Sequence, residues 1–177
     1  MQNETAPTQQ KSTYTAARSL PSQRLDPRAK TLWRISGVVE AAFTVPVAAG
    51  VVFVLQAVTR LPTLVTLLPL ALVLLTAIIA IFIAPSVRWR RWRYEIRDTE
   101  VDLQRGVIYI TRTLVPLARV QHVDTQQGPF ERWLGLATVV FFTAGGSHKI
   151  PALDSGAARE VAGRIGDLAK VARDEPV

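Results

Sequence analysis

Cysteine is absent from this chain of 177 residues, which excludes disulfide frameworks, cysteine zinc sites and thiol catalysis. Histidine is scarce too: His122 and His148 are the only two, and we expect them in different strands with no acidic partner at ligand spacing. A metal site usually needs three or four protein ligands, so we expect no metal. The sequence also lacks a glycine-rich phosphate loop, a nucleophile elbow and a paired-carboxylate pattern. We therefore expect neither enzymatic activity nor a cofactor.

Positive charge is concentrated outside the part of the chain that we expect to fold as a soluble domain. The formal net charge is +7, yet from Tyr94 onward the chain has ten basic and eleven acidic residues. The surplus lies in residues 1–34 and 88–93, beside the hydrophobic segments. Nucleic-acid binding needs clustered Lys and Arg to replace counterions, so we expect no nucleic-acid partner.

Two long hydrophobic runs follow one another near the N-terminus. Residues 35–58 contain one charged residue, Glu40, and residues 61–84 contain none. As a helix, each run would be about 36 Å long, enough to cross a hydrocarbon core of about 30 Å. The break between them is very short and includes Pro62, which suits the first turn of a helix. The pattern predicts a transmembrane hairpin over residues 31–87, preceded by a disordered polar tail over residues 1–30.

Basic residues flank the outer ends of both runs, whereas the turn between them has only Arg60. Lys and Arg near span ends favour the cytoplasmic side, so we expect a multi-pass protein of the cell membrane with both termini in the cytoplasm. Tryptophan and arginine at this interface would anchor the protein in the lipid bilayer. The expected anchors are Trp33, Arg34, Arg88, Trp89, Arg90, Arg91, Trp92 and Arg93.

Residues 88–172 read as a small soluble domain, followed by a tail over residues 173–177. Apolar residues alternate with charged ones on both sides of Asp98-Thr99-Glu100, which predicts a β-hairpin. Further strands are expected over residues 107–115, 120–125, 136–143 and from about 148, with a short irregular or helical piece before Gly135. In the strand 136–143, either Val139 and Phe141 or Val140 and Phe142 should face the core. A helix capped by Asp154 or Ser155 would follow, with Ala157, Val161, Ile165 and Leu168 on its apolar face.

Glu40 is the most unusual residue of the hydrophobic runs, because a carboxylate inside a span is costly and is a candidate functional group. It lies near the expected cytoplasmic interface. It could snorkel to that interface or pair with an arginine there, contact a partner helix, or couple to protons or ions. Small residues at four-residue spacing, such as Gly37 and Ala41, predict close packing against the second helix or another subunit.

Several short segments resemble those of the bacterial pleckstrin-homology (PH) domains of the YdbS-like type, also described as membrane-flanked domains. The segments are residues 116–124, 127–129, 132–137 and 143–146. The resemblance covers residues 31–170 and implies two roughly orthogonal antiparallel sheets capped by a C-terminal helix. With the hairpin, the expected fold is a membrane protein of the α+β class with a PH-like partial barrel. The resemblance supplies no catalytic residues.

These features favour a non-enzymatic, membrane-anchored interaction or scaffold module whose partners are other membrane proteins or a second copy. Phe130 and Trp133 are the candidate interaction surface, although they could also form a hydrophobic plug under the barrel. A lipid-sensing or lipid-binding protein, or an accessory subunit of a membrane transporter, is the alternative. Specific headgroup recognition is disfavoured, because the turn Asp98-Thr99-Glu100, which corresponds to the basic loop of eukaryotic PH domains, is acidic.

Overall fold

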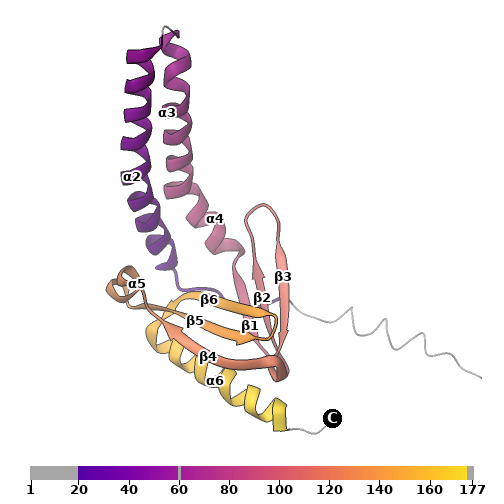
Figure 1. Ribbon diagram of the computed structural model, residues 1–177. Helices are drawn as coiled ribbons and strands as arrows, with labels where there is room; N and C mark the ends of the chain where they lie inside the picture. Colours follow the sequence, from indigo (N-terminus) through magenta and orange to yellow (C-terminus); the bar gives the residue numbers. More distant parts are fainter. Residues whose placement is uncertain (1–19, 60, 175–177) are drawn as a thin grey trace, which may run out of the picture.

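The computed structural model describes residues 20–59 and 61–174. Two long antiparallel helical segments project from a small β-rich domain (Figure 1). The first is α2, Ala29–Val58; the second runs without a break through α3, Thr63–Ile78, a π-helical segment, η1, Ile79–Ile83, and α4, Ala84–Arg91. Both are long and apolar enough to cross a membrane, and most of their large apolar side chains are exposed. The hairpin expected from the sequence is therefore present.

The helices extend further toward the soluble domain than the hydrophobic runs suggest. Helix α2 begins at Ala29, and α4 ends only at Arg91. The helical backbone thus includes the basic flanks, and the chain becomes extended at Trp92. The prediction of a disordered tail over residues 1–30 is wrong for residues 20–30. Leu25 and Ala29 are buried in the core of the soluble domain, and Gln23 forms a β-bridge with Tyr94. The prediction for residues 1–19 lies outside the described residues.

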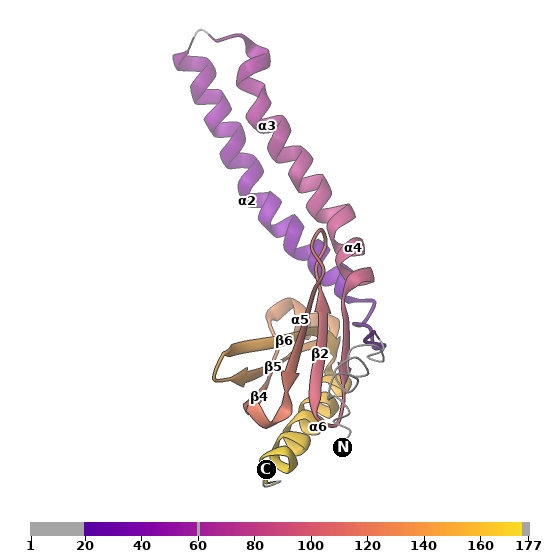
Figure 2. The same ribbon diagram turned by 90° about the vertical axis from the view of Figure 1, so that its right-hand side faces the viewer.

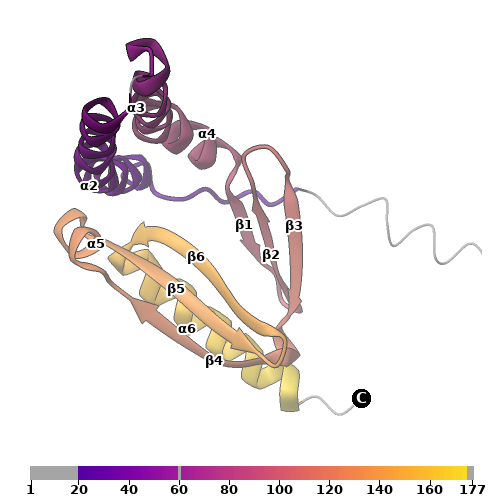
Figure 3. The same ribbon diagram turned by 45° about the horizontal axis from the view of Figure 1, so that its top comes forward.

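Two three-stranded antiparallel sheets, with strands running in crossing directions, form the body of the domain (Figures 1 and 3). The first sheet has the order β1-β2-β3 and the second β4-β5-β6. The strands are β1, Arg93–Ile96; β2, Glu100–Arg105; β3, Thr111–Pro116; β4, Val120–Gln126; β5, Leu136–Thr143; and β6, Gly146–Asp154. A 3-10 turn, η2, Leu117–Arg119, joins the two sheets. This arrangement confirms the expected fold class.

One strand is shorter than expected. Residues 107–115 were predicted as a continuous strand, but β3 begins only at Thr111 and residues 107–110 form a loop. Gly106 is the physical reason: its φ is +135°, and a Cβ there would overlap the carbonyl oxygen of Tyr109. The chain thus folds back sharply at Gly106, and the apolar residues that follow are left outside the sheet.

The core lies between the two sheets and the C-terminal helix α6, Ser155–Asp174. Val139 and Phe141 of the central strand face this core and are fully buried, whereas Phe142 is half-buried. The predicted apolar face of α6 is right for Ile165, which is buried, and for Val161 and Leu168, which pack against the core, but wrong for Ala157, which is exposed. Ala158 is buried instead, because both alanines fit a helical period and the sheet contacts select between them.

Candidate functional site

The spans and the soluble domain are joined by direct side-chain contacts as well as by the chain. The indole Nε1 of Trp89, on α4, donates hydrogen bonds to the carbonyl oxygens of Leu25 and Asp26, at 3.0 and 3.2 Å. The ammonium of Lys30 lies 4.4 Å from the Trp89 ring centroid, which is a cation–π contact. The segment before the first span is therefore held against the end of the second.

Arg28 forms a second connection, between the start of α2 and residues much later in the chain. Its guanidinium bonds to the carboxylates of Asp26 and Asp154, at 3.0 and 2.8 Å, and donates to the carbonyl oxygen of Leu134 at 2.9 Å. The hydrogen bond from Arg28 lowers the pKa of Asp154 below its ordinary value, helped by the backbone N–H of Gly156. Leu134 ends the short helix α5, Pro129–Leu134, so one side chain connects the start of α2 to the end of α5 and to the last residue of β6.

The expected interface anchors differ in how far they are exposed. Arg34, Arg90 and Arg91 are exposed, and the guanidinium of Arg88 lies 4.5 Å from the centroid of the Trp33 ring. Trp92 is different: it is buried in the domain core, so the prediction that it anchors the protein at the membrane interface is wrong. Arg93 is half-buried in β1. The anchoring role of the exposed residues stays a prediction.

Glu40 is exposed on α2 and lines a small hollow between the two helical segments. Thr44 and Thr76 line the same hollow, at the level of α3. Among residues 20–59 and 61–174 no ion pair reaches Glu40, so the pairing with an arginine is not observed there. Gly37, one turn earlier, packs against η1: a Cβ there would lie 3.2 Å from Ile81 Cγ1. Gly37 thus allows the two spans to pack closely. Packing against the second helix was one of the two predicted alternatives.

Phe130 and Trp133 lie on α5, beside the domain end of α2 (Figure 1). Their side chains are 41% and 76% exposed, so the alternative of a hydrophobic plug under the barrel is wrong. The helix is fixed at its start by the Glu131 carboxylate, which accepts a hydrogen bond from the Gly128 N–H at 2.8 Å. An exposed tryptophan on a rigid support is suited to contact with another surface. Its role as an interaction surface remains a prediction.

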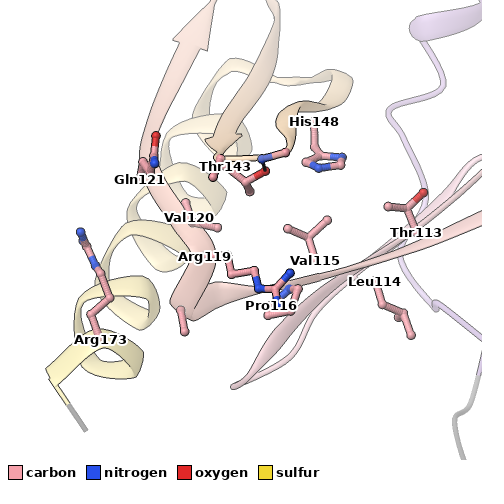
Figure 4. A pocket seen from close by; sticks show the side chains of 13 residues that line it. Thr113, Leu114, Val115, Pro116, Arg119, Val120, Gln121, Thr143, His148 and Arg173 are labelled. Carbon is pink, nitrogen blue, oxygen red and sulfur yellow. Dashed lines mark hydrogen bonds between the residues drawn. The ribbon is translucent and has the colours of Figure 1, made fainter. Parts of the chain in front are cut away.

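A groove of about 530 Å³ opens where the two sheets meet, and we call it the inter-sheet groove (Figure 4). Its apolar wall includes Val115 and Val120, one from each sheet. Arg119 reaches it from η2 and His148 from β6, whereas Arg173, at the end of α6, lines its edge and donates from Nε to the carbonyl oxygen of Ala169 at 3.1 Å. No acidic side chain is among the described residues that line it. The groove is thus apolar at its base and basic at its rim.

The charge of this groove at neutral pH comes from its arginines. His148 stacks on the ring of Phe141, with centroids 5.5 Å apart, and burial lowers the pKa of its imidazole, assisted by the positive charge of Arg105. Both effects disfavour the protonated, charged form of His148. Sequence reasoning missed the groove, since Arg119 and Arg173 are far apart in the chain and each is flanked by ordinary surface residues.

The acidic turn between β1 and β2 points away from the membrane hairpin (Figures 1 and 2). Arg97 is held there by carboxylates, with contacts to Glu95 at 3.3 Å and Glu100 at 3.6 Å. Asp102 is fully buried and accepts hydrogen bonds from Arg112, at 3.0 Å from Nε to Oδ1. These ion pairs are structural, and they offer no free basic cluster on this turn for an anionic headgroup.

His122 and His148 lie in β4 and β6, on either side of β5. His122 has a nearby carboxylate that the sequence reading did not expect, with Nε2 3.8 Å from Asp124 Oδ2. Within the described ranges, no three His, Asp or Glu side chains lie close enough together to hold a metal ion.

Comparison with known proteins agrees with this geometry. The family model described as "Bacterial PH domain" matches residues 41–169. The UPF0699 transmembrane protein YdbS of Bacillus subtilis (strain 168) is 37% identical over 158 residues, which is 89% of this chain and 99% of that protein. YdbT of the same organism is 29% identical over 82 residues, which is 46% of this chain and 17% of that protein. No solved structure matches the chain. The resemblance drawn from the sequence is confirmed, and the chain belongs to the bacterial PH domain family of membrane proteins.

Proposed function

We propose that this protein is a non-enzymatic interaction module that holds its PH-like domain at the cytoplasmic face of the cell membrane, with both termini in the cytoplasm. The observation that carries the proposal is the inter-sheet groove, which combines an apolar base with a basic rim. Such a groove suits a protein segment that presents apolar side chains and carboxylates. Partners would be other membrane proteins or a second copy of this chain.

The contacts of Arg28 and Trp89 support this proposal, because they fix the domain relative to the spans. A domain on a flexible linker would sample many orientations, whereas this one is held in place. The groove lies near the C-terminal end of α6, and in Figure 1 this end is remote from the hairpin. The groove therefore lies away from the bilayer, where a segment of another protein on the same side of the membrane could enter it. Restriction to the membrane raises its effective concentration for other membrane proteins.

Site-specific crosslinking in native membranes tests the proposal. A photo-reactive amino acid replaces Gln121, which lines the groove, and in a matched control it replaces Arg159, an exposed residue of α6. We expect a discrete protein adduct from position 121 that disappears when Arg119 and Arg173 are both changed to Glu. Adducts from position 159 should not respond to that change. Equal adduct patterns with and without the charge reversal would contradict the proposal.

Membrane attachment should be required for this activity. A knockout should be complemented by the full chain and by a chimera in which an unrelated two-span anchor replaces the hairpin. The soluble fragment alone should fail. Full complementation by the fragment would show that tethering is unnecessary. Failure of the chimera together with failure of Glu40→Gln would assign function to the spans, as in an accessory subunit of a transporter.

Lipid binding is the second candidate function, and one observation favours it. Arg88 and Arg105 line a hollow of about 290 Å³ beside α4, near the expected membrane surface. Cations at this level attract anionic lipids by about 1 kcal/mol each. Changing both arginines to Gln should weaken the enrichment of phosphatidylglycerol around the purified protein, measured by native mass spectrometry. The same change should leave the crosslink at position 121 intact.

A further inference from the structure

The loop between β2 and β3 carries an exposed apolar tip, residues 107–110. Ile108 and Tyr109 are 84% and 85% exposed, and Val107 and Ile110 are also exposed. Outside the membrane hairpin, no other four consecutive large apolar residues are exposed in the part of the chain that the structure describes. Exposed apolar patches of this kind mark contact sites.

The sheet register places this tip beside α4, at the end of the second span that adjoins the soluble domain. Arg93 pairs with Gln104, so the chain beyond Gln104 extends past the start of β1 and runs alongside α4. At about 3.3 Å per extended residue the tip reaches about 10 Å beyond Arg93. Helix α4 rises by about the same distance over its length. Figures 1 and 2 both show the tip level with α4, on the side of the domain that faces the hairpin.

The chemistry around the tip matches the layers of a bilayer surface. The hollow beneath it is lined by Arg88, Arg105 and Trp92, together with Gly106 and Val107. No acidic residue is among the described residues that line this hollow. Arginines at phosphate level below apolar side chains, with a tyrosine at the boundary, are the order of groups found at membrane interfaces.

The tight turn at Gly106 makes the tip a defined projection. Its φ of +135° and the proximity of the Tyr109 carbonyl exclude any residue with a Cβ. The neighbouring hairpin turn at Asp98 has the opposite character, since it is acidic and points away from the spans. One end of this sheet is therefore apolar and the other charged.

We propose that residues 107–110 insert into the lipid interface beside α4, as a third membrane contact in addition to the two spans. The bilayer covers Ile108 and Tyr109, and Arg88 and Arg105 lie below them at the level of the lipid phosphates. The tip then gives the first sheet a direct contact with the membrane surface, in addition to its connection to the spans.

The absence of cysteine allows a direct test on the full chain. Ile108→Cys, and in a matched control Asp98→Cys, is labelled with an environment-sensitive fluorophore and reconstituted into phosphatidylcholine–phosphatidylglycerol vesicles. We expect blue-shifted emission at position 108 and several-fold stronger quenching by lipids spin-labelled high on the acyl chain than at position 98. Tyr109→Cys gives a second, independent reading of the same tip.

Two outcomes would overturn the proposal. Equal emission and equal lipid quenching at positions 108 and 98 would place the tip in water. A blue shift at 108 without lipid quenching would mean that a second copy of this chain covers the tip. Positions 98, 108 and 109 all lie outside the inter-sheet groove, so the test reads the tip separately from the groove. Thermal unfolding of each labelled variant confirms that the domain is intact.

Discussion

Arg28 and Asp154 form an ion pair of 2.8 Å that connects the start of the first membrane helix to the start of the last helix of the soluble domain. The same guanidinium bonds to Asp26 and to the carbonyl oxygen of Leu134. Three parts of the domain therefore meet at one side chain immediately below the membrane. Its removal should loosen the domain from the spans before it unfolds either one.

We expect Arg28→Met to destabilise the soluble domain in a pH-dependent way. The pKa of Asp154 is lowered by Arg28, so this carboxylate stabilises the folded state fully above its ordinary value of about 4. As the pH falls through the lowered pKa, Asp154 becomes protonated in both the folded and the unfolded protein. Its contribution to the free energy of unfolding is then lost. The difference in unfolding free energy between wild type and variant, measured in detergent, should shrink below about pH 4. Arg34→Met is the control, and an undiminished difference at pH 3 would contradict this explanation.

Leu25→Ala should cost about 3 kcal/mol of stability. Leu25 is 2% exposed and belongs to the domain core, although it precedes the first span. Hydrogen exchange of the β5 amides measures the effect. Leu20→Ala is the matched control, because Leu20 is 70% exposed and should cost less than about 0.5 kcal/mol. Similar effects at the two positions would argue against a structural role for residues 20–30.

Phe141→Ala should cost about 3–5 kcal/mol, since its ring is fully buried between the sheets. Phe142→Ala should cost clearly less. Phe142 is half-buried and stacks on His122, with ring centroids 4.3 Å apart. Chemical denaturation of the two variants in the same detergent compares them directly. The reverse order of stabilities would place the core on the other face of β5.

Topology can be tested at the turn between the spans. A cysteine replacing Arg60 should react with an impermeant maleimide added outside intact cells, and a reporter fused after Val177 should be active only in the cytoplasm. The reason is the seven Lys and Arg residues that flank the outer ends of the spans, against one in the turn. A C-terminal reporter that is active outside the cell would show that the predicted orientation is wrong.

Local patterns predict the spans, five of the six strands and the helices, since each depends on periodicity or length. The exception within the sheets was the start of β3, where the apolar residues 107–110 look like a strand but follow the turn at Gly106. Tertiary contacts account for the other differences. Leu25 is an apolar residue in a polar segment, and Trp92 belongs to a basic flank, yet both are buried in the core of the soluble domain.

The candidate sites were less predictable for the same reason. The inter-sheet groove is lined by Arg119 and Arg173 only because two sheets and a helix meet there, and neither residue has a local sequence signature. Glu40 could be singled out because a carboxylate in a hydrophobic run is rare at any position. The exposure of Trp133 depends on the placement of α5, which the sequence leaves open.

Helix α2 continues without interruption from the core of the soluble domain into the bilayer, with Leu32 buried at one end and Phe53 exposed at the other. A continuous helix transmits rotation from one of its ends to the other. Transmembrane helices respond to a thinner bilayer by tilting, and any tilt of α2 would rotate the attached domain through a similar angle. The direction in which the inter-sheet groove faces would then depend on membrane thickness, which would make lipid composition an input to partner binding.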